Sequence, residues 1–229
     1  MSDAHRKLIS FDCYGTLIRF DLDGAVRGIV GPRAAECGID VEGLITDLRV
    51  IRFFATSSPY RRYQDILRDT LEIACMRHGI PFDARFGDEL IEAVRRFEAF
   101  DDVHAGLTRL QEMGYQLALL TNSDNDLIPH HVKTLGIDFD HVFTAENARA
   151  YKPRKQAFEY MFRMVDRPRE FLTHAAQGWE YDIIPTAGMG IRRVWINRSQ
   201  LPGNQFFAPY HEVSDTHGLA DLMAATDQG

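Results

Sequence analysis

The chain is poor in cysteine and in long apolar runs, and each shortage excludes a class of protein. Its 229 residues include three cysteines, Cys13, Cys37 and Cys75, without any CxxC spacing. Neither a disulfide framework nor a zinc site is therefore expected. The longest uninterrupted apolar stretches, such as 117–120, are far shorter than the roughly 18 residues that a membrane-spanning helix needs. We expect no interaction with the interior of a membrane.

The chain also lacks an excess of positive charge, which argues against nucleic acid as a partner. The formal net charge is −7 at pH 7, whereas a phosphate backbone favours a basic protein face. One basic cluster could face either a small anion or solvent; it consists of Arg49, Arg52, Arg61, Arg62 and Arg68. The polar start MSDAHRK has no apolar core like that of a signal peptide. We therefore expect a cytoplasmic protein.

Apolar runs typical of buried strands alternate with helical patterns over most of the chain. The predicted strands cover 7–13, 115–121, 139–144, 171–176 and 191–196, and the predicted helices cover 103–113, 127–135, 155–165 and 181–187. Such alternation gives a parallel sheet with right-handed crossovers. The predicted fold is α/β, with a Rossmann-like parallel sheet.

The segment between the first two strands has a helical pattern only. Apolar residues recur there at helical spacing, as in Leu90, Ile91, Val94 and Phe97, and no convincing strand appears. We predict an α/β core domain of residues 1–20 and 98–229, and an inserted helical cap domain of residues 21–97. An insertion at this point would lie over the carboxyl edge of the sheet, where open α/β sheets bind ligands.

Polar side chains follow four of the predicted strands. Asp12 ends the first strand, Thr121 and Asn122 end the second, Lys152 in YKP follows the third, and Asp182 in GWEYDIIPTAG follows the fourth. Alone, Asp12 could be a nucleophile, a metal ligand or a helix N-cap. Because the carboxyl ends of parallel strands meet at one edge, we expect these groups to share one crevice.

These four motifs, in this order and over nearly the whole chain, resemble the haloacid dehalogenase superfamily. Its pattern is a nucleophilic aspartate in DxxGT, a Thr or Ser after the second strand, a Lys in a KP motif and acids after the fourth strand. The resemblance implies that Asp12, Thr121, Lys152 and Asp182 are catalytic. It also implies that Thr16, the threonine of the first motif, contacts the substrate.

Tyr14 narrows the resemblance to one branch. Superfamily phosphatases carry at this position an Asp that protonates the leaving alcohol, and a tyrosine, with a pKa of about 10, is a poor general base. The FDxYGTL form and VWINR at 194–198 resemble the (S)-2-haloacid dehalogenases. The resemblance implies hydrolysis of short 2-haloalkanoic acids through an ester on Asp12. Lys152 would lower the pKa of Asp12, and Asp182 would orient or activate water and pair with Lys152.

The chain departs from the dehalogenase pattern at three positions. Phe158 stands where those enzymes have a tyrosine, and Gln177 and Trp179 stand where they have a serine and an asparagine. Gln177 can still hydrogen-bond to water, but Phe158 cannot replace a phenolic hydroxyl. Gln177 and Trp179, together with Tyr14, are predicted substrate contacts.

The halide and carboxylate of a small anionic substrate need donors. Asn122 matches the asparagine that helps cradle the halide, although an asparagine there is also a turn former. Arg49 and Arg52 are the candidates for the arginine that the resemblance implies, because a guanidinium suits such anions; Arg49 is preferred. The resemblance also suggests a homodimer through the cap.

The expected cofactor content is none, with magnesium as the alternative. The phosphatase spacing DxxxxD falls here on Gln177 and Asp182, so its first acid is missing. Asp12, Asp182 and the Tyr14 carbonyl could still hold magnesium, which leaves a phosphatase acting on a small phosphorylated metabolite as the second hypothesis. A ligand-binding protein with degraded catalysis is the third.

Three histidines receive structural predictions. His130 and His131 are adjacent and are interpreted as surface residues. His174 lies inside the fourth predicted strand and is predicted to be buried with a backbone partner, the alternative being a catalytic relay near Gln177.

Overall fold

The computed structural model describes residues 7–227. The chain folds into two compact units: one combines the chain through Arg19 with the chain from Glu98, and the other is Phe20–Phe97. Over residues 7–227, no helix combines the length and the apolar character that crossing a membrane requires.

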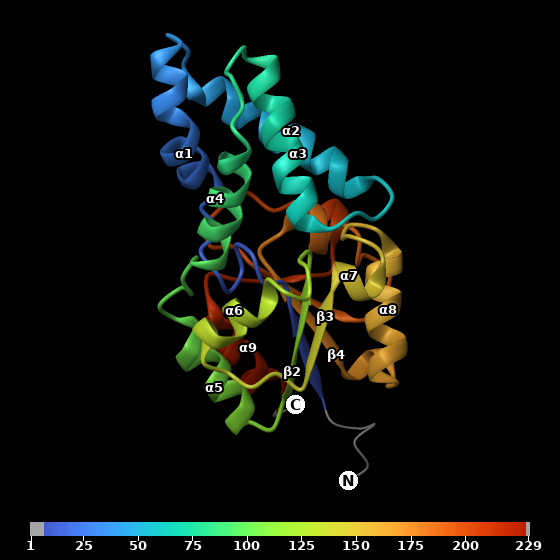
Figure 1. Cartoon of the computed structure of the whole chain (residues 1–229). Helices are drawn as coiled ribbons and strands as arrows, with labels where there is room; N and C mark the ends of the chain where they lie inside the picture. The colour runs from blue at the N-terminus through green and yellow to red at the C-terminus, as the bar shows by residue number, and fades with distance from the viewer. Residues whose placement is uncertain (1–6, 228–229) are drawn as a thin grey trace. The chain divides into compact units, whose positions relative to one another are not determined.

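The first unit is built on a parallel sheet, which confirms the predicted α/β class. In the described part of the chain this sheet has six strands in the order β3-β2-β1-β4-β5-β6. Figure 1 labels β2, β3 and β4. They are β1 (Leu8–Phe11), β2 (Gln116–Thr121), β3 (His141–Thr144), β4 (Leu172–Ala176), β5 (Arg192–Ile196) and β6 (His211–Val213). The strand β6 was not predicted, because its three residues, HEV, are largely exposed and form no apolar run.

The first unit also contains helices and short turns. They are α5 (Val103–Glu112), α6 (Ile128–Leu135), α7 (Ala145–Ala148), α8 (Lys155–Val165), α9 (Thr216–Asp227), and the short turns η2 (Arg169–Phe171), η3 (Trp179–Ile183) and η4 (Gln205–Phe207). The predicted helix at 181–187 is wrong: the chain forms the π-helical turn η3 and then irregular turns. Pro185 in this segment has no N–H to continue a helix.

The central strands of the first unit lie in its hydrophobic core. Every residue of β1 and β2 is buried, which is why these strands are nearly continuous apolar runs. Leu8 and Leu120 pack against Phe158 and Met161 of α8 in one hydrophobic cluster. The polar residues that follow the strands are therefore held on a rigid frame.

The second unit is helical in the described chain and consists of α1 (Leu22–Glu36), α2 (Val41–Ser57), α3 (Tyr63–Arg77) and α4 (Ala84–Arg95). Asp21, Asp40 and Asp83 each accept a backbone N–H at the start of a helix, which is the usual role of an aspartate N-cap. The apolar positions of α4 that suggested a helix, Leu90 among them, are buried.

Candidate active site

Two carboxylates share one buried ammonium at the carboxyl end of the sheet. Lys152 Nζ donates to Asp12 Oδ1 at 2.7 Å and to Asp182 Oδ1 at 2.7 Å. Asp12 is only 7% exposed, and Lys152 and Asp182 are each 1% exposed. Asp12 directly follows β1, and Asp182 lies in η3 after β4. The structure thus brings together three of the four predicted catalytic residues as a hydrogen-bonded cluster.

The turn after Asp12 orients its carboxylate. Thr16 Oγ1 donates to Asp12 Oδ2 at 2.7 Å and accepts from the Gln177 N–H at 2.8 Å. Gly15 has φ of 83°, a left-handed conformation that suits glycine, and this lets the chain turn back. Thr16 is fully buried. Its hydroxyl is hydrogen-bonded to Asp12 and to the segment that follows β4.

Asn122 holds the segment that carries the lysine. Its Nδ2 donates to the Lys152 carbonyl at 2.9 Å, and its Oδ1 accepts from the Lys152 N–H at 2.8 Å. One hydrogen on Nδ2 is left for a further acceptor. Thr121, the fourth predicted catalytic residue, is buried, and its Oγ1 has no hydrogen-bond partner in the described chain.

Tyr14 lies between Ser123 and a buried histidine. Its hydroxyl and Ser123 Oγ are 2.9 Å apart, and its ring meets the His131 ring edge-on at 5.1 Å. The prediction that His131 is a surface residue is wrong, since it is fully buried on the same face of α6 as Ile128 and Leu135. Their helical spacing was the available signal. Burial, together with the charge of His130, lowers the pKa of His131 to about 4.

The residues that replace the usual dehalogenase groups lie in packed surroundings. The ring of Trp179 lies 4.7 Å from that of Trp195, whose Nε1 donates to the Gln177 carbonyl at 3.1 Å. Phe158 is fully buried, and its ring meets the His174 ring edge-on at 5.6 Å. Phe158 therefore contributes packing around a histidine.

His174 is joined to the carboxylate cluster through side chains. Its Nε2 lies 2.9 Å from Asp182 Oδ1, and its Nδ1 lies 2.8 Å from Ser10 Oγ. The predicted burial is right, because His174 is 0% exposed, but the predicted backbone partner is wrong. Ser10 and His174 are register partners on β1 and β4. The sequence analysis missed Ser10, since only the strand pairing identifies it.

The electrostatics of the two carboxylates differ. Burial and the negative charge of Asp182 raise the pKa of Asp12, although Lys152 and Thr16 act in the opposite direction. Burial also opposes ionisation of Asp182, but Lys152 and His174 outweigh it and hold the pKa of Asp182 below its usual value. The expected lowering of the Asp12 pKa by Lys152 is present, but it does not decide the net shift, because desolvation is larger.

The candidate arginines both belong to the helical unit. Arg49 forms a bidentate pair with Asp23 there. Arg52 donates to the Tyr63 hydroxyl at 3.2 Å, and its buried Nε has no hydrogen-bond partner among residues 7–227. The preferred candidate, Arg49, is thus already neutralised by a carboxylate, and Arg52 retains an unused donor.

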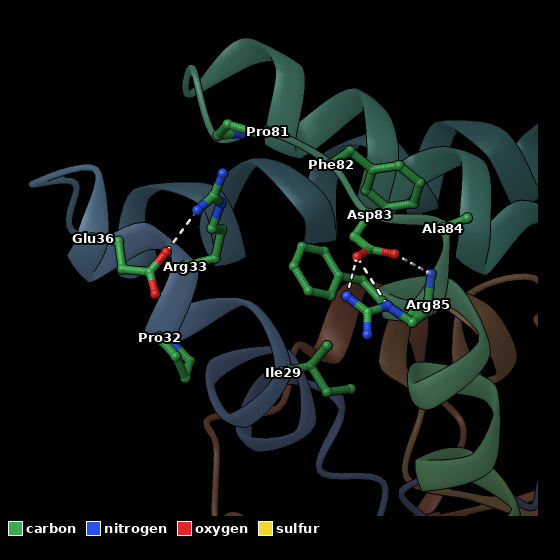
Figure 2. Close-up of a pocket in the computed structure, with 10 residues that line it drawn as sticks. Ile29, Pro32, Arg33, Glu36, Pro81, Phe82, Asp83, Ala84 and Arg85 are labelled. Atoms are coloured by element: carbon green, nitrogen blue, oxygen red, sulfur yellow. Dashed lines mark hydrogen bonds and ion pairs between the residues drawn. The ribbon is translucent and has the colours of Figure 1, made fainter.

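The helical unit also contains a cavity of about 700 Å³. Figure 2 shows two ion pairs among the residues that line it, Arg33 with Glu36 and Asp83 with Arg85. Phe82 and Phe86 contribute apolar surface. None of the predicted site residues lines this cavity, and we assign it no role in the chemistry.

For magnesium, the candidate site offers the carboxylates of Asp12 and Asp182. No three His, Cys, Asp or Glu side chains of the described chain are placed to hold a metal ion. Asp12 and Asp182 each give an oxygen to the Lys152 ammonium, and the first acid of DxxxxD is replaced by Gln177. The chain itself therefore supplies the cation that both carboxylates bind.

Comparisons with known proteins identify the family. Residues 6–172 match the family model of haloacid dehalogenase-like hydrolases. The chain is 28% identical to the (S)-2-haloacid dehalogenase of Pseudomonas sp. (strain YL), over 95% of this chain and 94% of that protein. It is 26% identical to (S)-2-haloacid dehalogenase 4A of Burkholderia cepacia, over 98% and 97%.

The fold is similar to the crystal structure of the L-2-haloacid dehalogenase RSc1362. The TM-score is 0.80 at 23% identity, and the match covers 96% of this chain and 99% of the other. The L-2-haloacid dehalogenase from Xanthobacter autotrophicus gives a TM-score of 0.76 at 17% identity, over 96% and 98%. By its family match, this chain belongs to the haloacid dehalogenase-like hydrolases.

Proposed function

We propose that the chain removes halide from short 2-haloalkanoic acids through an ester on Asp12. The observation that carries the proposal is the buried cluster of Asp12, Lys152 and Asp182, with a tyrosine and no acid at position 14. A halide leaves as a stable anion, so its departure needs no general acid. The (S)-2-haloacid dehalogenases among the relatives support this choice of substrate.

The first step is a displacement at carbon 2 of the substrate. The Asp12 carboxylate forms a C–O bond as the carbon–halogen bond breaks, and the halide departs with the electron pair. Back-side attack inverts the carbon, so an (S)-2-haloacid gives an (R)-2-hydroxyacid. Thr16 and Lys152 each hold one oxygen of Asp12, which orients the nucleophile before the substrate arrives.

The second step hydrolyses the ester. Water attacks the carbonyl carbon of Asp12 and gives a proton to the Asp182 carboxylate. The bond from this carbon to the substrate oxygen then breaks, and the departing alkoxide takes that proton. Asp12 is left as the carboxylic acid and regenerates the nucleophile by losing its proton to solvent. The overall change is haloacid plus water to hydroxyacid, halide and a proton. The lowered pKa of Asp182 keeps it ionised and able to accept.

The remaining expectations stay predictions. No metal is needed in this scheme, because Lys152 supplies the positive charge next to both carboxylates. Three of these expectations are untested: that an arginine from the helical unit binds the halide, that the protein is a homodimer, and that it is located in the cytoplasm.

Halide release from (S)-2-chloropropionate, with and without EDTA, tests the proposal. The expected result is chloride release that EDTA leaves unchanged and that the matched Asp12→Asn variant lacks. If the protein released no more halide than this variant across chloro-, bromo- and fluoroacids of several lengths, the proposal would fail. Magnesium-dependent hydrolysis of a phosphate ester in a parallel assay would then favour the phosphatase hypothesis.

A further inference from the structure

We propose that His174 is a positioning residue for the hydrolytic half of the reaction: it fixes Asp182 so that the second carboxylate oxygen stays available to take the proton of water. This inference rests on the proposed function. It assigns a role to a buried histidine and to Ser10, neither of which the four sequence motifs include.

The three side chains form a continuous buried series. Ser10 Oγ lies 2.8 Å from His174 Nδ1, and His174 Nε2 lies 2.9 Å from Asp182 Oδ1. Exposure is 1% for Ser10, 0% for His174 and 1% for Asp182. Because two of the three residues lie on paired strands of the sheet, the ring is held more rigidly than a side chain on a loop would be.

The donors in this series can be assigned. An ionised carboxylate only accepts hydrogen bonds, so His174 Nε2 must carry the hydrogen that points to Asp182. When the ring is neutral, Nδ1 accepts and the Ser10 hydroxyl donates to it. The other acceptor near that hydroxyl, the Thr173 carbonyl, is farther away at 3.3 Å. Ser10 thereby selects the tautomer in which His174 donates to Asp182.

The two oxygens of Asp182 have different surroundings. Oδ1 accepts from Lys152 Nζ and is within hydrogen-bond distance of His174 Nε2. Oδ2 is buried and has no hydrogen-bond partner among the described residues. Oδ2 therefore keeps unused lone pairs with which it can accept a proton.

His174 matters most after the ester has formed. Lys152 also binds Asp12, and this contact weakens when Asp12 loses its charge in the ester. The hydrogen bond from His174 does not involve Asp12, so it holds Asp182 in the same orientation before and after the first step. Removing His174 should therefore slow hydrolysis of the ester while leaving its formation in place.

The test compares His174→Leu with His174→Gln in rapid-quench kinetics with (S)-2-chloropropionate. For His174→Leu we expect a chloride burst close to one equivalent of enzyme, a steady rate slower by about 10- to 100-fold, and accumulation of the esterified Asp12 peptide in mass spectra. His174→Gln, which retains an amide donor, should restore part of the steady rate.

A packing control separates positioning from structure. Phe158→Leu alters the packing against the same ring and removes no polar group, so it should give no burst and no ester. Equal slowing of both steps in His174→Leu, or a burst in Phe158→Leu, would overturn the inference.

A spectroscopic measurement tests the inference without relying on turnover. The ring ¹⁵N shifts of His174 should report a protonated Nε2 and an unprotonated Nδ1, and Ser10→Ala should disturb that pattern and give a smaller burst. The opposite tautomer in the unmodified protein would also overturn the inference. Absence of chloride release from the unmodified protein would remove the proposed function and this inference together, whereas normal release with the wrong tautomer removes this inference alone.

Discussion

The charged cluster at the candidate site of the sheet unit and the ion pairs of the helical unit lie in opposite environments. In the sheet unit, the side chains of Asp12, Lys152 and Asp182 are at most 10% exposed. In the helical unit, the pairs Arg27–Glu42 and Arg33–Glu36 have side chains that are 44% to 65% exposed. Exposed pairs contribute little to stability, whereas a buried cluster pays a desolvation penalty and so points to a functional role. The following predictions test this contrast.

The largest effect is expected for Asp12→Asn. Loss of the nucleophile should reduce halide release by at least about 10⁴-fold. Stability should not fall with it: the pKa of Asp12 is raised, so its stabilising contribution is present at low pH and lost as pH rises through the folded pKa. A neutral side chain avoids that loss at pH 7. Chloride assays and urea unfolding check both statements, and a strongly destabilised variant would contradict the second.

Lys152→Met should be the most destabilising change in the cluster. It leaves Asp12 and Asp182 buried together without their cation, and removal of one partner from a buried ion cluster costs about 3–5 kcal/mol. Lys133 on α6 is exposed, and Lys133→Met provides the matched control with no expected change in the free energy of unfolding. Similar unfolding midpoints for the two variants would show that the buried Lys152 contributes no more to stability than the exposed Lys133.

Asp182→Asn should destabilise the protein by about 1–3 kcal/mol at pH 7, the range for a buried hydrogen-bonded charge. The pKa of Asp182 is lowered, so its contribution is present above the unfolded value of about 3.8 and is lost as pH falls through the folded pKa. The gap between the variant and the unmodified protein should therefore close in acid. Urea unfolding as a function of pH measures it, and a gap that widened there would reverse the assigned shift.

The pH dependence of kcat/KM should show an acid limb with an apparent pKa above the ordinary carboxyl value of 3.8. Asp12 must be ionised to attack, and burial together with the charge of Asp182 raises its pKa. A profile that stayed flat down to pH 3.8 would show that Lys152 dominates over burial.

The smallest effect is expected in the helical unit. Arg33→Ala removes a solvent-exposed pair with Glu36, and the thermal midpoint should stay within experimental error. A clear drop in the midpoint would show that the exposed pairs contribute more to stability than their environment implies. It would contradict the contrast drawn between the buried cluster and the exposed pairs.

The sequence was informative where the signal is local. Apolar periodicity predicted the main strands of the sheet, and the spacing of the four motifs placed Asp12, Lys152 and Asp182 at one sheet edge. The family could also be recognised, because the motifs keep their order along the chain. Short exposed segments such as β6 carry no apolar pattern, and sequence reasoning missed that strand.

What could not be predicted depends on contacts between distant residues. Ser10 and His174 are 164 positions apart, and only the register of β1 against β4 brings them together. The net pKa shift of Asp12 likewise depends on how deeply the folded chain buries it, and no spacing rule gives that depth. For His131 the helical spacing was present. The residue was nevertheless interpreted together with the adjacent His130 as a surface histidine.

The most direct test of the central claim is a single turnover in H₂¹⁸O with enzyme in excess over (S)-2-chloropropionate. Because water attacks the carbonyl carbon of Asp12, the account predicts ¹⁸O in the peptide that contains Asp12 and none in the 2-hydroxyacid product. Label in the product with an unlabelled Asp12 peptide would mean that water displaces the halide directly, and it would contradict the ester on Asp12.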